Sequence, residues 1–213
     1  VVDSSGDLPV TRSTNVDAGF SIIMTEGTDA SGQKIPHGLG KAPEWILAKQ
    51  IDQGYNWDVF HVGCTAGSTL ILNSTAAQDG TRDAYYNAGD GPVDSQFIYA
   101  KDEYVTSGGG ERTILYAWTG IEGYSNFGSY VGNGASSGTA GTKDGAFIYL
   151  GFKPAFFMMK TSSAAGGHWL MYDNKRNTVN PTQGTIAAQD TAVENTGTEN
   201  AVDFLSNGVK CRD

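Results

Sequence analysis

The sequence predicts an all-β protein, and three observations support that prediction. The 213 residues include 29 Gly, ten Tyr, nine Phe and four Trp, a composition rich in turn-forming and aromatic residues. Only 17% of the residues are charged, and stretches with a helical period are scarce. Short apolar runs recur between turn signals, which is the pattern of successive strands.

Six such runs lie in the first half of the chain. The predicted strands are Phe20–Met24, Trp45–Lys49, Trp57–His61, Leu70–Leu72, Phe97–Tyr99 and Thr113–Trp118. Clusters of Gly, Asp, Ser and Pro at 29–32, 88–92 and 107–110 suit the turns between them. Six strands within about 100 residues predict a β-sandwich.

The second half repeats this order. The motif G-x-x-P stands before the run 45–49 and again, 111 residues later, before the run 156–160. Further matches pair Trp57 with Trp169, the tetrapeptide AAQD at 76–79 with AAQD at 187–190, and Phe97 with Phe204. These matches, in one order and at nearly one offset, predict a duplication.

We therefore expect two tandem, related β-sandwich units that are jelly-roll-like. The first spans 19–123, the second spans 124–213, and residues 1–18 are an N-terminal extension or the end of a preceding segment. The partner of the first unit's last strand would fall 107 residues after Thr119, beyond Asp213, so the second unit is expected to lack its last strand. An unpaired edge favours completion by another chain or by a continuation of the same chain.

The composition also limits the kinds of partner that we expect for this chain. Lys and Arg number 14 against 23 Asp and Glu, and the net charge of −9 would repel a phosphate backbone, so nucleic acid is not expected as a partner. No apolar run reaches the roughly 18 residues of a membrane helix, and the N-terminus lacks the pattern of a signal peptide. Cys64 and Cys211 lie far apart, and free thiols are expected rather than a disulfide.

The sequence shows no recognisable catalytic or cofactor motif. A G-x-S-x-G elbow is absent, and the three histidines are His37, His61 and His168, without the Cys or His spacing of a zinc site. The Gly-rich segment 132–141 lacks the G-K-[ST] ending of a phosphate loop. We expect no catalytic residue, no metal and no cofactor.

Paired carboxylates for glycoside cleavage stay open as an alternative. The acidic residues that could converge in a groove are Asp58, Asp102, Glu103, Glu111 and Asp173. Glycosidases place two such groups on either side of the scissile bond, and the sequence does not single out a pair.

Four aromatic residues are candidates for stacking on a sugar ring. Tyr85 and Tyr86 lie in a polar loop, and Trp57 and Trp169 lie on predicted strands. The two tryptophans, as matched positions of the repeat, are alternatively core residues.

Several segments together resemble a known family. They are NVDAGFSI at 15–22, HGLGKAPE at 37–44, GYSNFGSY at 123–130, GFKPAF at 151–156 and DFLSNG at 203–208. The chain resembles, from about residue 15 to residue 212, an uncharacterised domain of virion proteins from marine and cyanobacterial tailed bacteriophages, often labelled tail fibre or tail protein.

This resemblance implies a non-enzymatic structural or adhesion protein of the virion, made in the cytoplasm of a bacterial host. A tail fibre or fibre-like appendage that contacts a host-surface glycan or protein is the leading expectation, with other virion subunits as partners and a homotrimer as the usual fibre assembly. The alternatives are a capsid decoration or head-fibre protein and a glycan-degrading enzyme with paired carboxylates. The family offers no catalytic residues to transfer.

Overall fold

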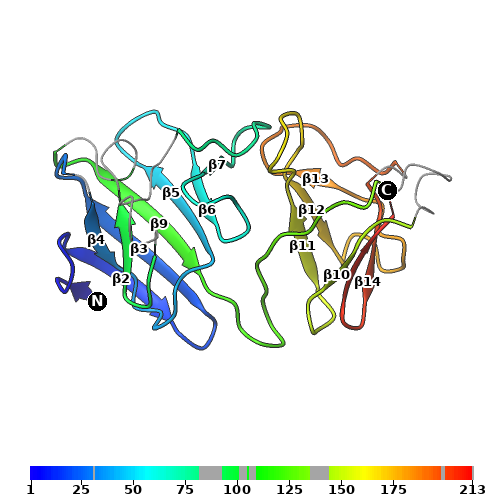
Figure 1. The fold of residues 1–213 in the computed structure, drawn as a ribbon, viewed down its shortest axis with the longest axis horizontal. Helices are drawn as coiled ribbons and strands as arrows, with labels where there is room; N and C mark the ends of the chain where they lie inside the picture. The colour runs from blue at the N-terminus through cyan, green and yellow to red at the C-terminus, as the bar shows by residue number, and fades with distance from the viewer. Residues whose placement is uncertain are drawn as a thin grey trace.

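The structure, a computed structural model, describes residues 1–30, 32–81, 93–100, 105, 109–134, 144–197 and 200–212. Every helix or strand in these residues is a β-strand, and the strands pair in antiparallel sheets. The predicted all-β class is therefore confirmed. Figure 1 shows two groups of strands, one formed by residues up to 118 and one by residues from 147 onward. We call them the N-terminal and the C-terminal group.

The N-terminal group contains a seven-stranded sheet and a two-stranded sheet. In order across the large sheet, the strands are β1 (Val2–Asp3), β2 (Val10–Asn15), β3 (Phe20–Glu26), β9 (Arg112–Trp118), β5 (Trp45–Gln50), β6 (Asp58–His61) and β7 (Leu70–Ile71). The small sheet pairs β4 (Gln33–Pro36) with β8 (Phe97–Ala100). The strand β9, last of these in the chain, joins β3 to β5 at the centre of the large sheet.

All six strands predicted in the first half form, with bounds that differ by no more than two residues from the predicted ones. The strand β2 was not predicted, because it reads Val-Thr-Arg-Ser-Thr-Asn and has little apolar character. It nevertheless pairs with β3 along its whole length, and Leu8 and Val10 are buried in the core. Residues 1–18, expected as an extension, thus contribute two strands and part of the core.

The core of the N-terminal group contains residues from both of its sheets. Side chains of a strand point alternately to its two faces, so every second residue of β3, β5 and β9 enters the core. The buried apolar residues are Val10, Ile23, Ile46, Ala48, Leu115 and Ala117 from the large sheet and Ile35, Ile98 and Ala100 from the small one. The intervening residues of β3, β5 and β9 point to the outer face of the large sheet.

The C-terminal group contains two three-stranded sheets. One has the order β10 (Phe147–Tyr149), β15 (Gly208–Cys211), β14 (Val202–Leu205), and the other has the order β11 (Phe156–Met159), β12 (Leu170–Asp173), β13 (Ile186–Ala187). Its buried apolar centre is smaller and comes from both sheets: Tyr172, Val202, Phe204 and Val209.

The two groups share details of strand pairing. The strand β6 lies between β5 and β7, as β12 lies between β11 and β13. Thr69 forms an isolated bridge beside β7, and Thr185 forms the corresponding bridge beside β13, 116 residues later (185 − 69). The AAQD segments at 76–79 and 187–190, matched at an offset of 111, therefore do not hold equivalent positions.

A second sequence match also shifts in the structure. The strand β8 pairs with β4, and β15 pairs with β10 in the same way. Val93 bridges to Ile98 of β8, as Phe204 pairs with Val209 of β15. The structural counterpart of Phe204 is therefore Val93 and not Phe97.

The strand β11 is an edge strand in the described part of the chain. Its counterpart β5 pairs with β6 on one side and with β9 on the other. The strand β11 pairs with β12, and no other described strand adjoins it. Ile46 of β5 is 0% exposed, whereas Phe157, at the corresponding place in β11, is only partly buried.

Candidate functional site

The outer face of the seven-stranded sheet carries a cluster of aromatic side chains, which we call the aromatic face. Its residues are Phe20 of β3, Trp45 of β5, Trp57 just before β6, and Tyr116 and Trp118 of β9. All five are partly buried, while their neighbours along the strands fill the core on the other side.

Strand register places three of these rings in one row. Phe20 lies opposite Trp118, and Trp118 lies opposite Trp45. The ring centroids are 4.8 Å apart in the first pair and 4.9 Å in the second, with 27° between the ring planes in both. Tyr116 lies 6.3 Å from Trp118, and Trp57 lies 6.4 Å from Tyr116. At these centroid distances the rings of the row stack face against face, so each ring covers part of its neighbour's face.

A polar margin borders the aromatic face along β2. The outward residues of this strand are Thr11, Ser13 and Asn15, all exposed, and Asn15 lies opposite Phe20. A sugar ring has apolar C–H faces and a rim of hydroxyl groups, so its C–H groups can contact the outward parts of the ring row while its hydroxyl groups meet the polar margin of β2.

The C-terminal group covers the β6–β7 end of this outer face. Val59 and Leu70 are buried there against Trp169, with Met158 packed beside them. The indole Nε1 of Trp169 donates a hydrogen bond of 2.9 Å to the carbonyl oxygen of Ile71. Trp169 is only 4% exposed and belongs to a buried contact between the groups, so it is not accessible to a ligand.

The remaining sequence candidates fall into two cases. Trp57 lies on the aromatic face, next to Tyr116, and is therefore placed where it could contact a ligand bound to that face. Tyr85 and Tyr86 lie outside the described residues.

Sequence reasoning missed most of the aromatic face. Phe20, Trp45, Tyr116 and Trp118 were recognised as strand residues, but alternation alone does not say which face of a sheet is covered. A signal was present in the last run of the first half, where the residues of one parity are small or aliphatic and those of the other include Tyr116 and Trp118.

A cavity of about 620 Å³ adjoins the aromatic face at the junction of the two groups. Glu44, Glu122, Phe127 and Tyr149 are among its lining residues. The ring of Phe127, which lines the cavity, lies 5.9 Å from that of Trp45 in the row. Carboxylates and aromatic rings around one cavity suit a ligand with many hydroxyl groups.

The carboxylates considered from the sequence are already engaged or enclosed. Asp58 is buried at 2% exposure, and Glu111 accepts a hydrogen bond of 2.6 Å from the Nε2 of Gln50. Asp173 accepts two hydrogen bonds from Arg176 through its Oδ1 and Oδ2 atoms, and these hold the pKa of its carboxyl at about 2. Asp102 and Glu103 lie outside the described residues.

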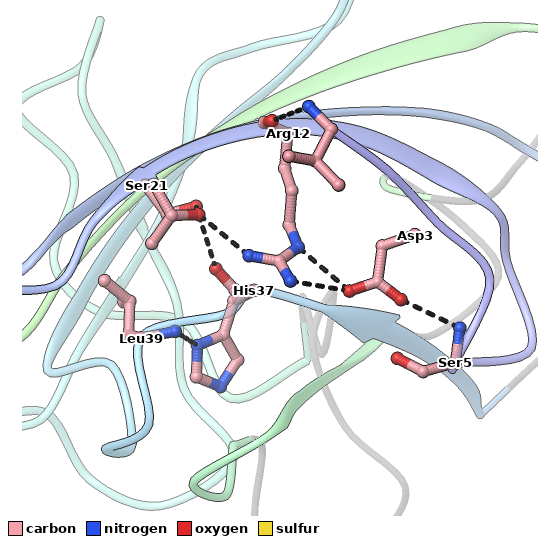
Figure 2. Close-up of polar contacts among 8 residues, drawn as sticks. Asp3, Ser5, Arg12, Ser21, His37 and Leu39 are labelled. Carbon is pink, nitrogen blue, oxygen red and sulfur yellow. Dashed lines mark hydrogen bonds and ion pairs between the residues drawn. The ribbon is translucent and has the colours of Figure 1, made fainter.

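A polar cluster centred on Arg12 holds the turn after β4 (Figure 2). The guanidinium donates through Nε and Nη2 to Oδ2 of Asp3, at 2.9 and 2.7 Å, and through Nη1 to the hydroxyl of Thr14 at 3.1 Å. The Thr14 hydroxyl lies 2.8 Å from that of Ser21 and 3.3 Å from the carbonyl oxygen of His37. These contacts tie β2 to the N-terminal segment, to β3 and to the turn after β4, which is a structural role.

Both ring nitrogens of His37 form hydrogen bonds with the backbone. The amide N–H of Leu39 donates to Nδ1, so Nε2 carries the proton and donates to the carbonyl oxygen of Asp94, at 3.1 Å in both cases. Burial lowers the pKa of His37, which keeps the ring neutral. The segment HGLG is thereby explained as a fixed turn, with φ of 73° at Gly38 and 72° at Gly40.

Other reactive groups form no site in the described ranges. Burial lowers the pKa of His61, whose Nδ1 accepts from the amide of Gly63. Cys64 and Cys211 are not joined in a disulfide, and the Sγ of Cys211 donates to the hydroxyl of Tyr130 at 3.8 Å. Among the residues that the structure describes, no group of three His, Cys, Asp or Glu side chains could bind a metal ion, and no helix has the length and apolarity to cross a membrane.

Comparison with known proteins gives one match, to a family model. Neither the curated proteins nor the solved structures include a significant match to the chain. The family model matches residues 1–213, the whole chain. The chain therefore belongs to the family described as Domain of unknown function (DUF7483).

Proposed function

We propose that this protein is a non-enzymatic adhesion module of a bacteriophage virion that binds a host-surface glycan through the aromatic face. The observation that carries the proposal is the row Phe20, Trp118 and Trp45, with nearly parallel rings beside the exposed hydroxyl and amide groups of β2. The sequence resemblance to tail-fibre-like virion proteins supports the setting, a tail fibre or similar appendage.

The physical basis is the contact of apolar sugar C–H groups with the parts of the aromatic rings that their neighbours leave uncovered. A favourable aromatic contact contributes on the order of 1 kcal/mol beyond the burial of its area. One such site binds weakly, but several copies on one particle act together and raise the avidity by orders of magnitude. A homotrimer joined to other virion subunits, which we propose as the assembly, would supply those copies.

We further propose that the chain consists of two tandem, related, jelly-roll-like units, 19–123 and 124–213, arisen by duplication. The shared pairing of β5, β6 and β7 with that of β11, β12 and β13 supports this, as do the corresponding bridges at Thr69 and Thr185. A rigid β scaffold of this kind presents a binding face without needing to move.

An array of bacterial surface polysaccharides tests the glycan proposal. The wild-type chain is expected to bind at least one glycan, and Trp118→Ala is expected to weaken that binding by about tenfold or more, because the central ring of the row is lost. Ser13→Arg tests the same face from the exposed margin, where a long side chain would block a ligand without disturbing the core.

Val193→Ala is the matched control, because Val193 is apolar, 91% exposed and outside the aromatic face. It is expected to bind like the wild type. Binding that survives both Trp118→Ala and Ser13→Arg would place the ligand elsewhere and overturn the proposal.

Glycan cleavage is the second candidate, because Glu44 and Glu122 line the same cavity beside the aromatic face. An enzyme would release reducing ends from a bound polysaccharide, and Glu44→Gln or Glu122→Gln would stop the release. We expect no release from the wild-type chain.

Antibody labelling of phage particles separates the tail position that we propose from a capsid decoration, which would be labelled on the head.

A further inference from the structure

We propose that the open edge of β11 binds an antiparallel strand with the side-chain pattern of β9, in which small or aliphatic residues face the core and aromatic ones face outward. The proposal does not rest on glycan binding. It rests on the pairing of β11, on its backbone geometry and on the exposure of its side chains.

The N-terminal group provides the template. There β5 lies between β6 and β9, and its register pairs Trp45 with Trp118 and Leu47 with Tyr116. In the C-terminal group β12 takes the place of β6, but no described strand takes the place of β9. An edge with unpaired backbone groups is a template for another strand.

The backbone of β11 points the right groups outward. The amide of Asn174 donates to the carbonyl oxygen of Ala155 at 3.1 Å, so Ala155 faces β12. Because the direction alternates along an antiparallel strand, Phe157 and Met159 also face β12, and the N–H and C=O groups of Phe156 and Met158 point to the open edge. A donated strand would form its hydrogen bonds with these two residues.

The side chains of β11 are less covered than those of β5. Ile46 and Ala48 are at most 2% exposed, whereas Phe157 and Met159, at the corresponding places, are only partly buried. Phe156 is 54% exposed. A strand along the open edge would cover these residues and enlarge the small core of the C-terminal group.

The template also defines the chemistry of the donor. In β9 the residues that enter the core are Thr113, Leu115 and Ala117, and those on the outer face include Tyr116 and Trp118. The donor opposite β11 therefore needs small or aliphatic residues toward the core and aromatic ones outward. A second β11 does not meet this need, because Phe157 and Met159 would bring long side chains to the core side.

The test uses a labelled peptide with the sequence of residues 110–120, GERTILYAWTG, added to the 213-residue chain. Fluorescence anisotropy is expected to show saturable binding, which a scrambled peptide lacks. Hydrogen exchange is expected to slow by about tenfold or more at the amides of Phe156 and Met158, because the new bonds protect them.

Two proline variants make the test specific. Phe156→Pro removes an outward N–H and leaves the bonds to β12 intact, so it is expected to weaken peptide binding by about tenfold, while the matched Phe156→Ala changes it much less. The same loss is expected when the peptide carries Tyr116→Pro, a variant that does not touch the folding of the protein.

Binding that both proline changes leave intact, or a peptide that protects no amide of β11, would refute the proposal. Concentration-dependent dimerisation of the chain alone, seen by light scattering and abolished by Phe156→Pro, would show that the occupant is a second copy and would also refute it.

Discussion

The turn HGLG depends on Gly38 because Arg12 occupies the space where a side chain would lie. A Cβ at Gly38 would fall 1.6 Å from the Nη1 of Arg12, and its φ of 73° already disfavours other residues. We expect Gly38→Ala to lower the free energy of unfolding by about 1 to 3 kcal/mol or more, measured by urea denaturation.

Gly40 provides the matched control. Its φ of 72° is nearly the same, but a Cβ there would meet nothing within 4 Å. Gly40→Ala should therefore cost only the backbone strain, about 1 kcal/mol. Equal losses for the two variants would show that Arg12 does not fill the space as described.

His37 predicts a pH dependence of stability between neutral and mildly acidic pH. Its folded pKa lies below the ordinary histidine value of 6.5 because burial disfavours the charged ring. The unfolded chain then binds a proton that the folded chain does not, so stability is full above about pH 7 and falls as the pH drops through 6.5 toward the folded pKa. His61, shifted in the same direction, adds to the effect.

The measurement compares urea denaturation at pH 7.5 and at pH 5.5. The wild-type chain should lose stability at the lower pH, and His37→Gln should lose less, because it cannot be charged while its amide can still donate to the carbonyl of Asp94. An identical loss in both proteins would mean that His37 titrates normally in the folded chain.

Single residues show where sequence reasoning ended. Trp57 could be named as a stacking candidate, but its partner Tyr116 could not, because the two lie far apart in the chain and meet only through strand order. Trp169 could not be assigned, since its burial depends on contact with Val59 and Leu70 of the other group. A sequence shows the chemistry of each side chain, whereas the exposure of that side chain depends on which other segments pack against it in the fold.

At the scale of elements, β9 connects the two sides of the large sheet, because it pairs with β3 on one side and with β5 on the other. Leu115 is 0% exposed and faces the core, while its neighbour Ile114 faces outward and is only partly buried. We expect Leu115→Ala to cost about 2 to 5 kcal/mol in denaturant unfolding, through lost burial and the cavity left behind.

Ile114→Ala is the control on the same strand and is expected to cost about 1 kcal/mol, because part of its surface already meets water. If Ile114→Ala cost as much as Leu115→Ala, the assignment of the two faces of β9 would be wrong. The aromatic face would then not be the outer one.

Most strands were predictable because their apolar runs are bounded by turn residues. The strand β2 is an informative exception. Its solvent-facing side chains are polar and its sequence has little apolar character, so it forms a strand through its pairing with β3. The correspondence in strand pairing between the two groups was detectable from G-x-x-P and the tryptophans. The AAQD match misled, because the segment between β6 and β7 is shorter than the segment between β12 and β13. Strand pairing is therefore a better guide to equivalent positions in the two groups than a short identical segment of sequence.

At the scale of the whole molecule, Trp169 couples the two groups. It packs on Val59 and Leu70, and its indole N–H binds the carbonyl oxygen of Ile71. We expect the wild-type chain to unfold in one calorimetric transition and Trp169→Ala to separate it into two, because the shared core is lost.

Trp169→Phe is the matched variant, which keeps an aromatic ring but removes the hydrogen bond and part of the indole. It should cost about 1 to 3 kcal/mol and retain the single transition. A single transition in Trp169→Ala as well would mean that the coupling depends on other contacts, such as the backbone bonds from Gln78 to Ser162 and from Gly166 to Thr75.

The aromatic face is the central claim, and NMR mapping of a bound glycan tests it most directly. An oligosaccharide selected from the array is titrated into the chain while the aromatic and indole resonances are followed. The account predicts the largest shifts at Trp118, Tyr116 and Trp57, with smaller ones along β2. Shifts confined to residues away from this face, such as Tyr172 of β12, would contradict it.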